Sequence, residues 1–161
     1  MGLVPAIHVF LAGGVKTWMP GTRPGMTTQR KVKMANTMHD VGVARQIGTY
    51  SDAVETPANA RWLVTAGTPG LAPDGQVPPD IAGQAELAWS HIVAMLARAD
   101  MSVHDLVKIT QYLLRPADIP AYARVRARVL GEARPASLLL IVPALVRPDF
   151  LIEIEAWAAK S

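Results

Sequence analysis

The segment Leu151-Ile152-Glu153-Ile154-Glu155-Ala156-Trp157-Ala158 places two isoleucines on one face of an extended chain and two glutamates on the other. This period of two predicts a strand with one apolar face. Just upstream, Ser137-Leu138-Leu139-Leu140-Ile141-Val142 is a continuous apolar run, which predicts a second strand that is buried on both faces. Two strands are therefore expected near the end of the chain.

Residues 61–99 predict a strand followed by a long helix. The strand, over 61–67, is rich in β-branched and aromatic residues and leads into a loop of prolines and glycines. Asp80 then stands at a helix N-cap position, and apolar residues recur at steps of three and four from Ile81 to Ala99. This pattern predicts a helix of about five turns with one buried face.

A further strand and a second helix are predicted next. Residues 106–114 are typical of a strand. A helix is expected to begin after Asp118, to tolerate Pro120 in its first turn and to end at Gly131, which suits a left-handed position after a helix. The apolar residues of this helix occupy one side, so its arginines are expected on a solvated face: Arg124, Arg126 and Arg128.

The elements follow the order strand, strand, helix, strand, helix, strand, strand, which predicts an α+β fold. Both helices can cover one face of a mixed sheet, and the opposite face must then be hidden as well. Hydrophobic residues make up 50% of the 161 residues and charged residues only 18%, so one chain is expected to leave apolar surface unburied. We therefore expect copies of the chain to associate.

Composition excludes several classes of protein. The absence of cysteine excludes disulfides, thiolate zinc sites and cysteine nucleophiles, and it suits the reducing cytoplasm, where we expect the protein. The net charge of +3 comes from dispersed basic residues, which argues against a nucleic-acid partner. The apolar stretch 3–15 is too short and too interrupted to span a membrane. His91 and His104 have no companion at metal-ligand spacing, so no metal site is expected.

Residues 1–44 are expected to form an N-terminal extension, because no helix or strand period persists there. A flexible extension, or an upstream start codon with the true start at Met26 or Met34, is preferred over a functional arm. Residues 45–161 are expected to form the single domain.

Four segments resemble the RidA (reactive intermediate deaminase, YjgF-type) family in order and spacing. They are Ile47-Gly48-Thr49-Tyr50-Ser51, Leu63-Val64-Thr65-Ala66-Gly67, Asp105-Leu106-Val107-Lys108, and Pro135-Ala136 through Ile152-Glu153-Ile154-Glu155-Ala156. The resemblance implies a chorismate-mutase-like fold assembled as a homotrimer, with the sheets lining a central barrel and the ligand clefts between neighbouring subunits. Such a trimer would cover the second face of the sheet.

The resemblance also implies a chemistry. Enzymes of the family hydrolyse reactive 2-imino or enamine acids to 2-oxo acids and ammonia without a cofactor, which requires a cation for the carboxylate and a group that activates water. By resemblance, Glu153 positions the water, Tyr50 closes over the ligand and the backbone of Gly67 lines the cleft. Ala66 stands where a hydroxyl residue is common, and Ala123 where an asparagine is common.

A structural role is the alternative for two of these residues. Glu153 can be a polar residue on the barrel-facing side of its strand, and Tyr50 can be an ordinary interface aromatic. Glu155, on the same face as Glu153, is expected to be structural.

Ser137 stands where the family has its arginine, directly after a Pro-Ala pair. A hydroxyl donates one neutral hydrogen bond, whereas a guanidinium offers a charged two-pronged clamp. Losing such a contact costs about 2 to 5 kcal/mol, so ordinary 2-imino acids are expected to bind weakly. Arg134 and Arg147 are candidates for a replacement cation, and the alternative is that both are solvated loop arginines.

Two functional hypotheses remain open. The first is a deaminase-like hydrolase for an enamine or imine, with Glu153 and Tyr50 as catalytic residues and with Ser137, Gly67, Ala66 and Arg147 at the ligand. The second is a non-catalytic binding or interaction module of the same fold. An endoribonuclease activity ranks third, since the sequence shows no general-base pair typical of RNA cleavage.

Overall fold

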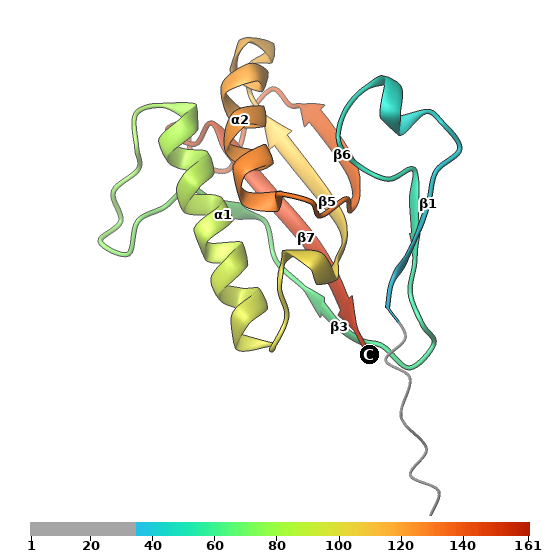
Figure 1. Ribbon diagram of the computed structural model, residues 1–161. Helices are drawn as coiled ribbons and strands as arrows, with labels where there is room; N and C mark the ends of the chain where they lie inside the picture. The colour runs from blue at the N-terminus through green and yellow to red at the C-terminus, as the bar shows by residue number, and fades with distance from the viewer. Residues whose placement is uncertain (1–34) are drawn as a thin grey trace, which may run out of the picture. The chain divides into compact units, whose positions relative to one another are not determined.

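The computed structural model of the protein describes residues 35–161 (Figure 1). Most of the expected N-terminal extension therefore lies outside the described residues. Strand β1 (Thr37–His39) pairs antiparallel with β2 (Ala53–Glu55), and the 3₁₀ helix η1 (Ala44–Gln46) lies between them in the chain. Strand pairing thus begins upstream of residue 45, where the sequence places the start of the domain.

A five-stranded sheet forms one layer of the fold. Its strands are β3 (Arg61–Val64), β4 (Thr68–Pro69), β5 (Leu106–Leu113), β6 (Ala136–Ile141) and β7 (Ile152–Lys160). Along the sheet the order is β3-β7-β5-β6, and β4 also pairs with β7. Strands β5 and β6 run parallel whereas the other pairs are antiparallel, so the sheet is mixed, as predicted.

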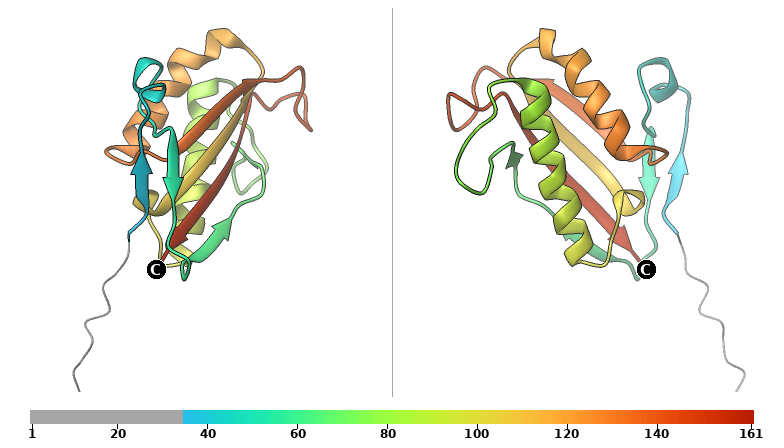
Figure 2. Two further views of the ribbon diagram at one scale, coloured as in Figure 1. Left: turned by 90° about the vertical axis from the view of Figure 1, so that its right-hand side faces the viewer. Right: turned by 60° about the vertical axis from the view of Figure 1, so that its left-hand side comes forward.

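Two helices, α1 (Ile81–Arg98) and α2 (Ile119–Leu130), form a second layer on one face of this sheet (Figures 1 and 2). Short 3₁₀ helices precede β5 and α2, at η2 (Val103–Asp105) and η3 (Pro116–Asp118). The Asp80 side chain accepts a hydrogen bond from the backbone N–H of Gly83, which confirms Asp80 as the N-cap of α1. The predicted α+β fold, with both helices on one face of a mixed sheet, is confirmed.

The core lies between the helices and the two central strands, β5 and β7. Ile152 and Ile154 of β7 are fully buried there, together with Ile109 of β5 and Trp89 of α1. Burial of each such side chain contributes about 1.5–3 kcal/mol. The two glutamates of β7 alternate with the isoleucines and face the other way, so the predicted period of two is confirmed.

The outer face of the sheet, opposite the helices, carries exposed apolar side chains. Leu138 and Leu140 of β6 are 43% and 39% exposed, and Trp62, Val64 and Trp157 are exposed as well. The prediction that β6 is buried on both faces is therefore wrong for the single chain. The reason is that β6 is the edge strand of the sheet, and within residues 35–161 no layer shields its outer leucines.

Candidate functional site

A cavity of about 490 Å³ lies between α2, β6 and the segment 47–50. Its polar walls come from the side chains of Thr49, Tyr50, Gln111, Tyr122, Arg126 and Ser137. Two residues predicted for the site, Tyr50 and Ser137, thus line one cavity, and Ala123 lies in the same wall. Much of the remaining wall is apolar, as is usual for small-molecule sites.

A chain of hydrogen bonds fixes the Ser137 hydroxyl. The buried Tyr122 hydroxyl donates to Oε1 of Gln111 over 3.0 Å, and Nε2 of Gln111 donates to Oγ of Ser137 over 3.2 Å. Nε2 also donates to the backbone oxygen of Leu138 over 2.7 Å, which fixes the orientation of the amide. Burial raises the pKa of Tyr122, so the first donor stays protonated. Ser137 therefore accepts from Gln111 in the wall of the cavity.

Arg126 lines this cavity as well, although the sequence predicted a solvated side chain. Its Nη1 and Nη2 each donate to the backbone oxygen of Thr49 over 3.3 Å, and its Nε is buried without an acceptor among residues 35–161. Burial lowers the pKa of Arg126. The prediction is therefore wrong for Arg126, because the cavity wall covers part of it, and is confirmed for Arg124 and Arg128, which are exposed.

The position of Arg126 at the cavity could have been predicted from its spacing to Ala123, although the pattern of apolar residues pointed to solvent. Ala123 was placed at the cleft by resemblance, and residues three apart on a helix share a face. Arg126 therefore belongs with Ala123 rather than with its exposed neighbours. Gln111 was also missed, and its signal is a polar side chain on the buried face of an otherwise apolar strand, since it alternates in step with Ile109.

Glu153 and Gly67 lie together on the outer face of the sheet. They line a hollow of about 340 Å³ to which Glu155 also contributes. A Cβ at residue 67 would stand 2.8 Å from Cδ of Glu153, well inside van der Waals contact, so glycine is required for the carboxylate to lie against this backbone. Ala66 precedes this point and is exposed.

The cavity and the hollow face opposite ways. Ser137 pairs with Ile109 of β5, and Glu153 pairs with Tyr112 of the same strand. Paired residues point to the same face of a sheet, and residues an odd number apart along a strand point to opposite faces. Within one chain, Ser137 and Glu153 therefore do not line one site.

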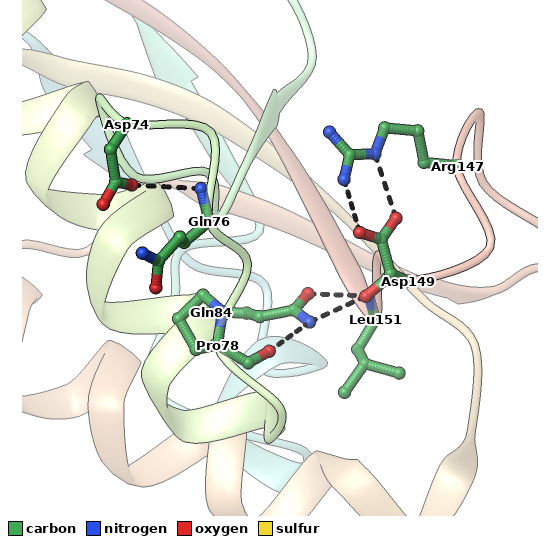
Figure 3. Close-up of polar contacts among 7 residues, drawn as sticks. All are labelled: Asp74, Gln76, Pro78, Gln84, Arg147, Asp149 and Leu151. Carbon is green, nitrogen blue, oxygen red and sulfur yellow. Dashed lines mark hydrogen bonds and ion pairs between the residues drawn. The ribbon is translucent and has the colours of Figure 1, made fainter.

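Arg147, a predicted ligand residue, is bound within its own loop (Figure 3). Its Nε and Nη2 donate to the two carboxylate oxygens of Asp149 over 3.0 and 2.5 Å. Gln84 of α1 holds the same loop, because its Nε2 donates to the backbone oxygen of Asp149 over 2.9 Å and its Oε1 accepts from the N–H of Leu151 over 2.7 Å. The structure does not place Arg147 in the wall of the cavity that holds Ser137.

The other predicted polar candidates have local partners. Arg134 donates to the backbone oxygens of Gly131 and Ala133, and Nε2 of His91 lies 2.7 Å from the backbone oxygen of Leu71. Among residues 35–161, no three histidine or acidic side chains gather where they could hold a metal ion. Nor does this part of the chain contain a helix with the length and apolar character needed to cross a membrane.

Comparison with known proteins matches residues 43–160 to the family described as Endoribonuclease L-PSP. The chain belongs to this family. One Endoribonuclease L-PSP relative is a RutC family protein of Pyrococcus horikoshii, 36% identical over 118 residues that cover 72% of this chain and 90% of that protein. Another is TdcF of Escherichia coli, provisionally named a reactive intermediate deaminase. It is 27% identical over 118 residues, which cover 71% of this chain and 89% of that protein.

Solved structures agree with this assignment to the Endoribonuclease L-PSP family. The Rid family protein YyfB of Yersinia pestis superimposes with a TM-score of 0.68 at 26% identity, covering 78% of this chain and 98% of that one. The crystal structure of Escherichia coli TdcF with bound serine gives a TM-score of 0.60 at 27% identity, covering 71% and 91%. The family predicted by resemblance is therefore confirmed, and with it the fold.

Proposed function

We propose that the protein hydrolyses a reactive enamine or imine to a carbonyl compound and ammonia, in a cleft formed between two copies of the chain. The observation that carries this proposal is that the predicted site residues lie on opposite faces of the sheet. Tyr50 and Ser137 line a cavity on the helix side of the sheet, whereas Glu153 lies against Gly67 on the outer face. A second copy is needed to bring a carboxylate to the cavity of the first.

The exposed outer face supports such an assembly. Trp62 and Trp157 meet edge to face with ring centroids 6.4 Å apart, and both stay exposed beside Val64. Leu138 and Leu140 continue the apolar surface on β6. Burying these side chains in a homotrimer, with the sheets around a central barrel, would remove apolar surface that a monomer leaves in water.

The proposed chemistry needs only water and one carboxylate. Glu153 accepts a proton from water as the water oxygen adds to the imine carbon, and it passes that proton to the imine nitrogen to give a carbinolamine. Glu153 then carries the hydroxyl proton of the carbinolamine to the nitrogen, the carbon–nitrogen bond breaks, and ammonia leaves as the oxygen forms the carbonyl group. Tyr50 shields the ligand from bulk water, and the backbone of Gly67 holds the carboxylate close to the reacting carbon.

Ser137 sets the ligand preference in this proposal. The resemblance places an arginine at its position, and the serine hydroxyl supplies one neutral hydrogen bond in place of a charged clamp. With Ser137 as the ligand's only contact at this position, slow turnover of ordinary 2-imino acids is expected relative to a family member that carries the arginine, unless another cation reaches the ligand.

The test is to generate imines in situ with an amino-acid oxidase and to follow ammonia and 2-oxo acid release. We expect release above the buffer rate with at least one acidic, aromatic or neutral imine, and loss of that acceleration in Glu153→Gln. Glu155→Gln is the matched control, because Glu155 lies on the same strand and the same face, and it is expected to retain activity.

Rates equal to buffer across all three imine classes would contradict the hydrolase. If small carboxylates or aromatic metabolites then raise the melting temperature, the protein is a non-catalytic small-molecule-binding module of the same fold. The cavity at Ser137 supports binding in either case.

A further inference from the structure

The guanidinium of Arg126 is poorly satisfied within the described chain. Its three hydrogen bonds all go to Thr49, two to the backbone oxygen and one to Oγ1, and each is 3.3 Å long. Good N–H···O bonds are about 2.9–3.0 Å long. The third nitrogen, Nε, is buried without an acceptor. Because Nε is covered by the protein, a ligand reaches the guanidinium through Nη1 and Nη2, whose long bonds to Thr49 leave them able to bind an anionic partner.

Among the nine arginines of residues 35–161, Arg126 is the partly covered one that lacks an acidic partner. Five of them have a carboxylate within ion-pair distance: Arg45, Arg115, Arg128, Arg134 and Arg147. Within residues 35–161, Arg126 has no such carboxylate, and neither do Arg61, Arg98 and Arg124. Those three side chains are exposed, whereas that of Arg126 is partly covered. The cavity wall thus contains a partly buried cation without a counter-ion.

We infer that Arg126 binds the carboxylate of the ligand in the cavity and takes over the charge that residue 137 lacks. Ser137 lines the same cavity, and because its oxygen accepts from Gln111 its hydroxyl hydrogen is available to donate to the ligand. A charged donor from α2 and a neutral donor from β6 then hold one carboxylate. The apolar part of the wall excludes water and strengthens both contacts.

This inference deepens the proposed function and rests on it for the place of the ligand. It names the specificity determinant: the protein takes small carboxylates and discriminates against their neutral analogues. Because the cation sits on the helix rather than on β6, the carboxylate is held by a different part of the cavity wall than an arginine at residue 137 would use.

The test is calorimetric titration of the full chain with pyruvate, the simplest 2-oxo acid, and with its neutral methyl ester. Arg126→Met keeps the length of the side chain but removes the charge, and we expect it to weaken pyruvate binding roughly ten- to hundredfold while leaving the ester unchanged. Arg126→Lys keeps the charge and is expected to recover part of the affinity. Arg124→Met, on the exposed side of the same helix, is the matched control and is expected to bind as the wild type does.

Several results would overturn the inference. They are equal pyruvate affinity in the wild type and Arg126→Met, an equal loss for pyruvate and its ester, or no pyruvate binding by the wild type. The equal loss for both ligands would mean that Arg126 only supports the segment at Thr49. Failure of the proposed function can be told apart from failure of this inference. If pyruvate binding depends on Arg126 but no imine is hydrolysed, the protein is not a hydrolase and Arg126 still binds the carboxylate.

Discussion

Replacing Gly67 by alanine is expected to separate catalysis from stability. The new Cβ would stand 2.8 Å from Cδ of Glu153 and closer still to Oε1, whereas ordinary contact begins at 3.4 Å. Cδ must therefore retreat by about 0.6 Å and Oε1 by more than that, and a misplacement of about 1 Å can cost a hundredfold in rate. The Glu153 side chain is flexible at its end, so the free energy of unfolding is expected to change by no more than about 1 kcal/mol. Steady-state imine hydrolysis and urea unfolding measure the two effects.

Gly70→Ala supplies the contrast for this prediction. A Cβ at residue 70 would lie 2.6 Å from the backbone carbonyl carbon of Gln84, in helix α1, where no flexible side chain can give way. We expect a loss of about 1–3 kcal/mol in stability from the displaced backbone. If Gly67→Ala keeps the wild-type kcat, Glu153 does not position the water.

Three further predictions concern buried polar groups and pH. Gln84→Leu leaves three backbone groups without their partner and is expected to lower the free energy of unfolding by about 3 kcal/mol, measured by urea titration. Tyr122→Phe leaves Oε1 of Gln111 buried without its donor and is expected to cost about 1–2 kcal/mol, measured in the same way, and a wild-type midpoint would contradict it. The hydrogen bond from Arg147 lowers the pKa of Asp149 below its ordinary 3.8, so this carboxylate stabilises the fold above that pH and the contribution is lost as pH falls through the lowered pKa. Between pH 2 and 6, the unfolding midpoint of Arg147→Met is expected to fall less steeply with decreasing pH than that of the wild type. The same pH dependence in both proteins would argue against a stabilising Arg147–Asp149 pair.

Local sequence patterns predicted the layers of the fold because those layers form within a single chain. The alternation around Ile152 and Ile154 and the N-cap at Asp80 depend only on neighbouring residues, and both are confirmed. The apolar run of β6 wrongly predicted burial on both faces, because a sequence pattern does not show whether the covering surface belongs to the same chain. Leu138 and Leu140 are apolar on the outer face, where the single chain has nothing to cover them.

The site was less predictable because its members come from different elements. The resemblance predicted Tyr50 and Ser137 for one site, and both line the same cavity. It gave no indication that the Ser137 hydroxyl accepts a hydrogen bond from Gln111. The helical pattern of apolar residues assigned Arg126 to water, since an amphipathic helix with a narrow apolar stripe does not reveal what packs beside its polar flank. That flank meets segment 47–50, which is distant in sequence.

We propose that each active site combines the Ser137 cavity of one chain with Glu153 of another. The direct test is to mix two variants that are inactive alone, Glu153→Gln and Ser137→Trp, the second of which fills the cavity, after denaturing and refolding them together in equal amounts. Random assembly pairs an intact cavity with an intact carboxylate in roughly a quarter of the clefts, so about a quarter of the wild-type rate is expected to return. If the refolded mixture stays as inactive as either variant alone, while both variants fold and assemble, each site lies within one chain and the account is contradicted.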